Sequence, residues 1–205
     1  MKKILIILLT SNFTFAQEGP LEMKSNTEGF SVGVNFNSLG WSSDYFTLLD
    51  DQESNGVGVG VELGYGITQR FEVIGRFDFS TLALENEWDY FTMGNAELMA
   101  RFNPGATTKK FRPYVELGVG NQGVSVSPIF FNNQQVEYAF SGIGFAYGAG
   151  LNFFLNRNLL ITANLAGSTG NMSSFTINGV GGIEDVPDVS NFRIRIGGRF
   201  YFKDL

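Results

Sequence analysis

The 205 residues include no histidine and no cysteine, so the side chains left for chemistry are chiefly carboxylates, guanidinium groups, serines and lysines, and nothing in the sequence points to a Ser/Lys site. Ser-His-Asp hydrolysis, thiol nucleophiles, HExxH zinc sites and histidine-ligated haem are therefore excluded. A pair of carboxylates can act as general acid and base. The acids at polar positions of this chain, however, are spread over several segments and interleaved with arginines. We therefore expect buried ion pairs, and neither an enzyme nor a cofactor or metal site. The cluster consists of Glu62, Glu72, Arg76, Asp78, Glu97, Arg101, Glu116, Arg193, Arg195 and Arg199.

One ion pair in this cluster can be placed from hairpin geometry. A three-residue loop at Thr68–Arg70 puts Ile67 opposite Phe71. Continuing that register puts Glu62 opposite Arg76. Two interpretations of the whole cluster stay open. It is either a salt-bridged plug that fixes strand register, or a narrow gated pore whose charges set ion selectivity.

These charged residues lie in segments whose polarity alternates with a period of two, as in β-strands with two unlike faces. In Val57–Thr68 every odd position is bulky and apolar, and every even position is glycine, glutamate or threonine. Ile143–Phe153 and Phe192–Phe202 alternate in a similar way. Eight such strands are predicted, at residues 29–41, 56–67, 71–82, 91–102, 113–122, 138–155, 159–168 and 191–202.

The connections between the predicted strands alternate between short and long, and both termini fall on the side of the short ones. Bacterial outer-membrane barrels have this arrangement, with an even number of strands, short periplasmic turns and longer outer loops. On the short side, Thr68–Arg70 and Asn156–Asn158 are tight turns, and Asn103–Arg112, which contains Pro-Gly, is of moderate length. The long ones are Ser42–Asn55, Ala83–Tyr90, Gly123–Glu137 and Thr169–Ser190.

Volume decides which face of the strands points outwards. The interior of an eight-stranded barrel is just wide enough to be filled by side chains, so the face of glycine and alanine with a few charges must be inside. The bulky face then points outwards, and an outer face this apolar requires lipid as its solvent. The sequence therefore predicts an all-β fold, an eight-stranded antiparallel up-and-down transmembrane β-barrel. A soluble barrel around an apolar ligand is the alternative, which solubility without detergent would favour.

Aromatic residues near the strand ends are expected to form two girdles at the two membrane interfaces. The outer girdle is predicted to contain Trp41, Trp88 and Tyr90, and the periplasmic girdle Phe71, Phe102, Phe153, Phe200 and Phe202.

Residues 1–16 have the pattern of a secretory signal peptide. Two lysines precede an apolar run at Ile4–Leu9, and the small residues Thr14 and Ala16 precede the expected cleavage site. Residues 17–205 are then one exported barrel domain. A net charge of −6 argues against binding to nucleic acid. The outer connections are rich in acids, which could share divalent cations with lipopolysaccharide.

Two stretches, Arg112–Gly120 and Gly144–Phe153, resemble strands of the small OmpA/OmpX-like outer-membrane β-barrel family, and a third, Arg193–Phe202, ends the barrel. The last is similar to the C-terminal strand that the barrel assembly machinery reads, except that Lys203–Leu205 follow its final aromatic residue. The resemblance implies a non-enzymatic, mostly monomeric protein of the Gram-negative outer membrane with a structural or surface-interaction role. Its implied partners are outer-membrane lipid, lipopolysaccharide and the barrel assembly machinery. The alternative is a small porin or an OmpW-like channel for ions or small apolar solutes.

Overall fold

The computed structural model describes residues 22–43, 55–82, 90–131, 134–181 and 188–202. The predicted signal peptide at residues 1–16 and Trp88 lie outside the described residues. Within the described ranges, no helix is long and apolar enough to cross a membrane. The strands are β1 (Gly29–Ser42), β2 (Asn55–Gly66), β3 (Phe71–Leu82), β4 (Tyr90–Phe102), β5 (Phe111–Phe131), β6 (Gln134–Phe154), β7 (Leu159–Asn171), β8 (Ser174–Ile177), β9 (Val180–Gly181) and β10 (Asp188–Tyr201).

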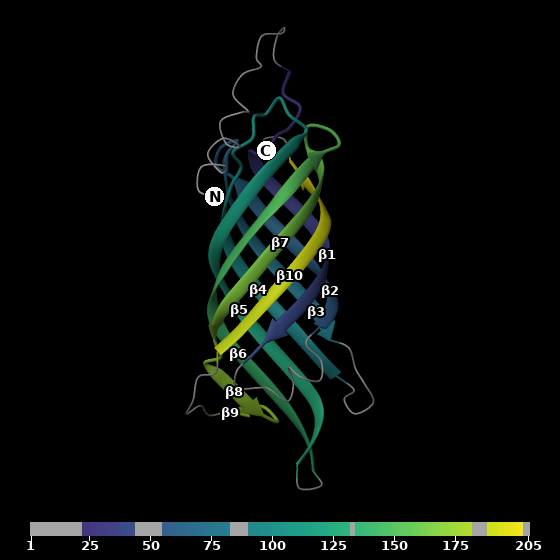
Figure 1. Ribbon diagram of the computed structural model, residues 1–205, viewed down its shortest axis with the longest axis vertical. Helices are drawn as coiled ribbons and strands as arrows, with labels where there is room; N and C mark the ends of the chain where they lie inside the picture. The colour runs from purple at the N-terminus through teal and green to yellow at the C-terminus, as the bar shows by residue number, and fades with distance from the viewer. Residues whose placement is uncertain (1–21, 44–54, 83–89, 132–133, 182–187, 203–205) are drawn as a thin grey trace, which may run out of the picture.

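Eight of these strands close into an antiparallel barrel (Figure 1). The hydrogen-bonded order is β5-β4-β3-β2-β1-β10-β7-β6, and the pairing of β5 with β6 completes the ring. The first and last barrel strands, β1 and β10, pair along their length, with Ser31 opposite Tyr201 at one end and Ser42 opposite Ser190 at the other. Closure pairs the backbone N–H and C=O groups that lipid would leave unsatisfied at an open edge. The predicted eight-stranded barrel is confirmed.

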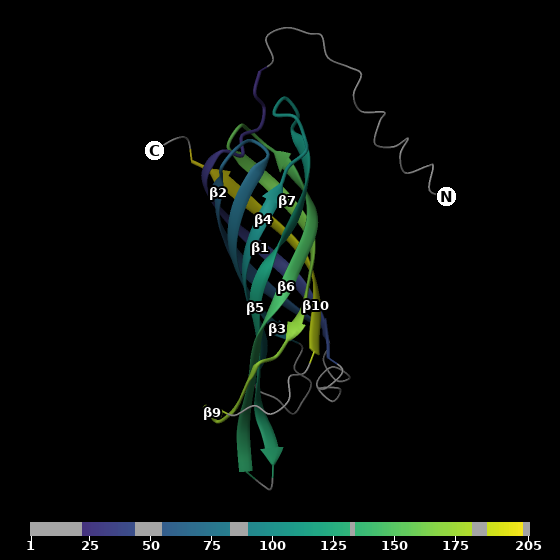
Figure 2. The same cartoon turned by 90° about the vertical axis from the view of Figure 1, so that its left-hand side faces the viewer.

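The two faces of the wall are arranged as the alternation predicts. On β2, the Val57 side chain is 71% exposed and the Val61 side chain 47%, whereas Glu62 is 5% exposed. The outer surface therefore consists of large apolar side chains. We refer to the end with the three short turns as the periplasmic end, by analogy with other outer-membrane barrels, and to the opposite end as the outer end. The first and last described residues both lie at the periplasmic end (Figure 2).

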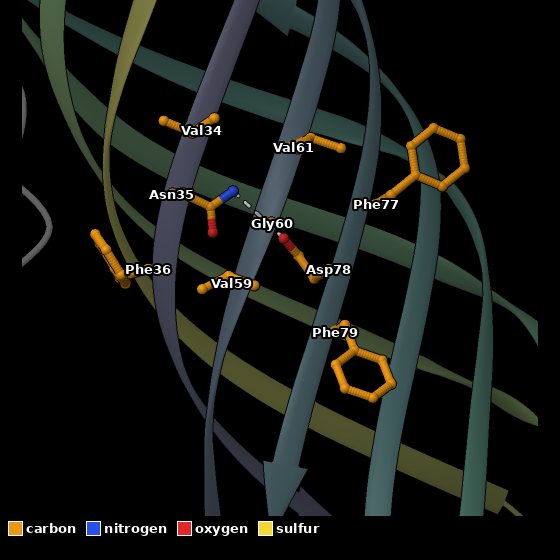
Figure 3. Close-up of a pocket in the computed structure, with 9 residues that line it drawn as sticks. All are labelled: Val34, Asn35, Phe36, Val59, Gly60, Val61, Phe77, Asp78 and Phe79. Carbon is orange, nitrogen blue, oxygen red and sulfur yellow. Dashed lines mark hydrogen bonds between the residues drawn. The ribbon is translucent and has the colours of Figure 1, made fainter.

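Glycine keeps the wall thin where polar side chains cross behind it. The side-chain amide of Asn35 donates a hydrogen bond to the Asp78 carboxylate at 3.4 Å, directly behind Gly60 (Figure 3). A Cβ atom at position 60 would lie 2.0 Å from that carboxylate oxygen. On β1–β3 the wall carries a groove of about 480 Å³ around Gly60, lined largely by outward valine and phenylalanine side chains such as Phe36 and Phe77.

β5 and β6 are longer than predicted, and they extend as a hairpin past the outer ends of the other barrel strands (Figures 1 and 2). The prediction of a loop at Gly123–Glu137 is wrong, because most of this stretch is paired strand with a register shift between Val126 and Ile129. Pro128 lies within that shift, where a missing N–H donor costs no ladder bond. β8 pairs with β6 and β9 pairs with β8. We call residues 128–131 and 134–139 together with β8 and β9 the outer extension.

The aromatic residues of the periplasmic end lie on the outer surface. Phe71 packs against Phe102 with ring centroids 4.9 Å apart. Phe111 packs against Phe153 at 4.7 Å, and Phe202 packs against Phe200 at 5.1 Å and against Phe30 at 5.6 Å. We call these seven phenylalanines the periplasmic aromatic belt: Phe30, Phe71, Phe102, Phe111, Phe153, Phe200 and Phe202.

The outer girdle differs from the prediction. Trp41 is 4% exposed and lies inside the barrel, with its ring 6.1 Å from that of Phe91. The prediction for Trp41 is wrong, because on β1 the odd positions face inwards and the tryptophan shares their parity. Tyr90 is the first residue of β4, and its side chain lies outside the described part of the structure.

Candidate functional site: the charged lumen

All ten charged residues of the predicted cluster are buried inside the barrel, and each is at most 6% exposed. They come from β2, β3, β4, β5 and β10, and they form one continuous network of ion pairs. Alternation places them there, because each has the inward parity of its strand. The structure therefore brings together acids and bases that are up to 137 positions apart in the sequence.

Arg76 is the centre of the network. Its Nε donates to Glu62 at 2.6 Å, which is the pair that hairpin geometry predicts. Its two terminal nitrogens contact Glu97 at 3.1 Å and Glu116 at 3.0 Å. Glu97 is a cross-strand neighbour on β4, whereas Glu116 lies on β5, two strands away. One guanidinium thus links strands on one side of the lumen.

Towards the outer end, two arginines of β10 share two acids from the opposite side of the lumen. Arg195 contacts Asp78 at 2.5 Å and Glu97 at 3.2 Å. Arg193 contacts Asp78 at 3.3 Å and also pairs with Glu97. Asn164 on β7 accepts a hydrogen bond from Arg195 at 2.9 Å, so this half of the network is also tied to the neighbouring wall.

Towards the periplasmic end, Arg199 of β10 pairs with Glu62 and contacts Glu72 at 3.3 Å. The Tyr201 hydroxyl and the Asn103 amide each donate to Glu72 at 2.6 Å. Both oxygens of Glu72 are therefore occupied by donors.

Arg101 completes the network at the level of β4 and β5. It contacts Glu116 at 2.8 Å, and its guanidinium carbon lies 3.9 Å from the centre of the Tyr114 ring. Asn164 donates to the other oxygen of Glu116 at 3.1 Å. Each of the five carboxylates is thus paired with at least one arginine, and the formal charges of the ten residues cancel.

The sequence predictions missed several lumen residues that the network uses. Asn164, Tyr114 and Tyr201 hold charged groups by hydrogen bonds or ring contact, and Arg112 is a sixth fully buried arginine. The signal was present, because Arg112 and Tyr114 share the parity of Glu116. In the described chain, Arg112 has no carboxylate within ion-pair distance. Its guanidinium donates instead to Thr27 and to the backbone carbonyl of Gln69.

A segment before β1 covers the periplasmic mouth of the barrel. We call residues 22–28 the cap. Ser25 and Thr27 within it are fully buried, which fixes the cap against the mouth. The cap is hydrogen-bonded to all three short turns: Ser25 N–H to Thr107 at 3.0 Å, Asn26 N–H to Arg157 at 2.8 Å and Thr27 hydroxyl to Gln69 at 2.8 Å.

An apolar layer closes the outer end of the lumen. Ten buried side chains pack together there, so the lumen is filled in three layers: cap, charged network and apolar layer. The expectation of an interior made only of small and ionic residues is therefore incomplete. The apolar layer consists of Leu39, Trp41, Leu82, Phe91, Met93, Val124, Val126, Phe140, Met172 and Val189.

The arrangement holds charge in place rather than exposing it for chemistry. Every lumen carboxylate accepts from an arginine, so none of the five is free to move a proton to a substrate. Among the described residues, no group of three or more acids forms a candidate metal site.

A closed antiparallel barrel with an apolar outer surface and a polar, ion-paired lumen defines a transmembrane β-barrel of the outer-membrane type. The outer membrane protein β-barrel domain matches residues 5–200, and the chain belongs to this family. It is a small outer-membrane β-barrel protein. No curated protein matches its sequence.

Solved structures of similar fold support the same class. Neisserial surface protein A has a TM-score of 0.63 at 15% identity, covering 85% of this chain and 98% of that one. OprG from Pseudomonas aeruginosa has a TM-score of 0.54 at 13% identity, covering 89% and 100%. Ail, the attachment invasion locus protein of Yersinia pestis, has a TM-score of 0.51 at 20% identity, covering 85% and 100%. At these identities the likeness concerns the fold alone.

Proposed function

We propose that this protein is a non-enzymatic component of the outer membrane whose barrel is sealed and whose outer extension makes surface contacts. The observation that carries the proposal is the neutral network of five acids and five arginines across the lumen. Such a network leaves no mobile charge and no free carboxylate in the middle of the barrel. Removing one partner of a buried pair costs about 3–5 kcal/mol, so the network also fixes the strand register.

The outer extension supports a role in surface contact. It stands beyond the ends of the other barrel strands (Figure 2), and it presents apolar side chains that do not face lipid. Phe130 is 70% exposed, Val180 79% and Ile177 38%. Rigid scaffolds commonly present binding residues on projecting segments of this kind.

Conductance of the refolded protein in a planar bilayer tests the proposal. We expect the wild type to pass almost no current. Glu62→Ala opens space and leaves positive charge in the lumen, so its current should be anion-selective. Arg76→Ala leaves negative charge, so its current should be cation-selective. The reversal potential in a salt gradient measures this difference in sign.

Matched controls remove charge outside the lumen. Glu137→Ala on the outer extension and Arg70→Ala in a periplasmic turn should stay as closed as the wild type, since both side chains are exposed. Steady wild-type conductance would instead favour the alternative function, a passive channel. The apolar layer at the outer end favours apolar solutes over ions for such a channel, and uptake of an apolar solute into proteoliposomes would identify it.

Export, partners and oligomeric state complete the proposal. Cleavage after residue 16 would release residues 17–205, and the barrel assembly machinery would insert them as a monomer. Lipopolysaccharide would contact the acidic outer connections through divalent cations. Mass spectrometry of the protein extracted from outer membranes would give the mature N-terminus directly.

A further inference from the structure

Every exposed basic side chain of the described chain lies at the periplasmic end of the barrel. Arg70 is in the turn after β2, Lys109 and Lys110 are in the turn before β5, and Arg157 is in the turn after β6. Lys24 lies in the cap, which is bonded to the same turns. We call these five residues the basic rim.

The outer end has the opposite character. The four connections at that end contain no lysine or arginine, and their charged residues are all acids. The described part of the periplasmic end therefore carries five exposed basic residues and two exposed acids, Glu22 and Glu28, whereas the sequences of the outer connections contain acids and no basic residue. The acids are Asp44, Asp50, Asp51, Glu53, Glu85, Glu87, Asp89, Glu137, Glu184, Asp185 and Asp188.

The backbone of the basic rim is fixed, while most of its charged groups have no acidic partner among the described residues. The Arg70 carbonyl accepts from Asn103 N–H at 2.7 Å, and Lys24 N–H donates to Thr107 at 2.9 Å. Arg157 has an ion pair with Glu22 at 3.7 Å. Within the described ranges, no carboxylate lies within ion-pair distance of the other four rim residues. Fixed cations without counter-charges suit an anionic ligand outside the barrel.

The periplasmic aromatic belt sets the depth of these cations. Arg70 directly precedes Phe71, and Lys110 directly precedes Phe111, whose rings pack outwards against Phe102 and Phe153. Aromatic belts mark the boundary between hydrocarbon and head groups. A basic residue one position nearer the turn is then at head-group depth, where a lipid phosphate is within reach of its long side chain.

We propose that the basic rim binds the phosphate groups of anionic phospholipids in the periplasmic leaflet of the outer membrane. A periplasmic polymer such as peptidoglycan would meet cations that project from the turns into water. Here the cations adjoin the aromatic belt, which favours lipid. One basic contact near a membrane surface corresponds to about a fivefold preference for an anionic over a zwitterionic lipid.

Spin-labelled lipids in vesicles of phosphatidylcholine containing the refolded protein test this proposal. We expect labelled phosphatidylglycerol to associate with wild type about fivefold more strongly than labelled phosphatidylcholine, and the preference to fall with added salt. The triple variant Arg70→Gln, Lys109→Gln, Lys110→Gln should bring the ratio to about one. Heat-dependent migration in detergent gels checks that each variant is folded.

The matched control changes the net charge by the same amount at the other end of the barrel. Gln134→Glu, Gln135→Glu and Ser174→Glu all replace exposed residues of the outer extension, and the phosphatidylglycerol preference should persist. An equal loss in this control would overturn the proposal, because the effect would then be one of net charge. A preference that persists in the triple variant would overturn it as well. So would binding to purified peptidoglycan that the triple variant abolishes in the absence of any lipid preference.

Discussion

In the charged layer of the lumen, large charged side chains lie directly against glycines of neighbouring strands. A Cβ atom at Gly148 would lie 2.9 Å from the Glu116 carboxylate, and one at Gly120 would lie 2.9 Å from the Glu97 side chain. The large charged groups thus occupy the room that glycines leave on neighbouring strands. This explains how the large charged side chains fit beside the inward glycines of β2, β5 and β6, and why the network is dense enough to pair every carboxylate.

Gly60→Ala tests whether the charged side chains need the space beside the glycines. Its methyl group would lie 2.0 Å from Asp78, which two arginines hold in place. We expect a loss of about 1–3 kcal/mol in the free energy of unfolding, measured by urea titration in vesicles. Gly94→Ala is the control, because a methyl group there would meet nothing within 4 Å. Equal stability of the two variants would contradict the packing argument.

At the same scale, the sequence predicts some contacts and not others for a physical reason. The Glu62–Arg76 pair follows from the length of one hairpin, since the turn sets the register of adjacent strands. The pairing of Glu62 with Arg199 crosses from β2 to β10. Both residues are register partners of Gly33 on β1, so the contact depends on how the first and last barrel strands, which no hairpin joins, are aligned when the barrel closes. That is a property of barrel stagger, which local alternation does not encode.

The outer extension shows how far two strands can continue once they leave the barrel. Beyond the barrel their strand partners among the described residues are each other and β8. Three aromatic rings support this small sheet. Phe140 and Phe175 stack with centroids 5.0 Å apart, and Tyr138 lies 5.7 Å from Phe175. The prediction failed here because the polar and proline-containing sequence has the composition of a loop. In the structure, however, residues 123–127 pair with β4, and residues 129–131 pair with β6.

Phe175→Ala should weaken this extension without opening the barrel. Loss of the stacked ring removes the main side-chain contact between β8 and β6, so limited proteolysis should cleave within the extension faster than in wild type. Val180→Ala removes a side chain that is 79% exposed and should leave the cleavage rate unchanged. Faster cleavage in both variants would mean that the aromatic stack is not what holds β8.

For the whole molecule, the outer surface is matched to a hydrocarbon layer between the two ends. Large apolar residues cover the middle of each barrel wall, the periplasmic aromatic belt marks one boundary, and charge of opposite sign lies beyond the two boundaries. The sequence predicts this placement well, because lipid imposes one requirement on every strand alike. It predicts the interior less well, because each strand meets different neighbours there. Trp41 illustrates the difference. It occupies an odd position of β1, and the odd positions of that strand face the lumen whatever residue they hold.

Depth in the bilayer can be measured with two valines of the same strand. Val61→Arg places a charge near the middle of β2 and should cost about 2–4 kcal/mol in the free energy of folding into vesicles. Val57→Arg lies near the outer end of the strand and should cost about 0–1 kcal/mol. A reversed order of these costs would place the bilayer elsewhere on the barrel.

The position of three network arginines on β10 bears on biogenesis. A chain in which only the strands up to β7 have inserted holds all five acids of the network but just two of its arginines, Arg76 and Arg101. Its unfinished interior is therefore anionic. Pairing of β10 with β1 closes the barrel. It also neutralises the excess negative charge with the guanidinium groups of Arg193, Arg195 and Arg199. Barrel closure and charge neutralisation therefore coincide, so an open barrel differs from a closed one in the net charge of its interior.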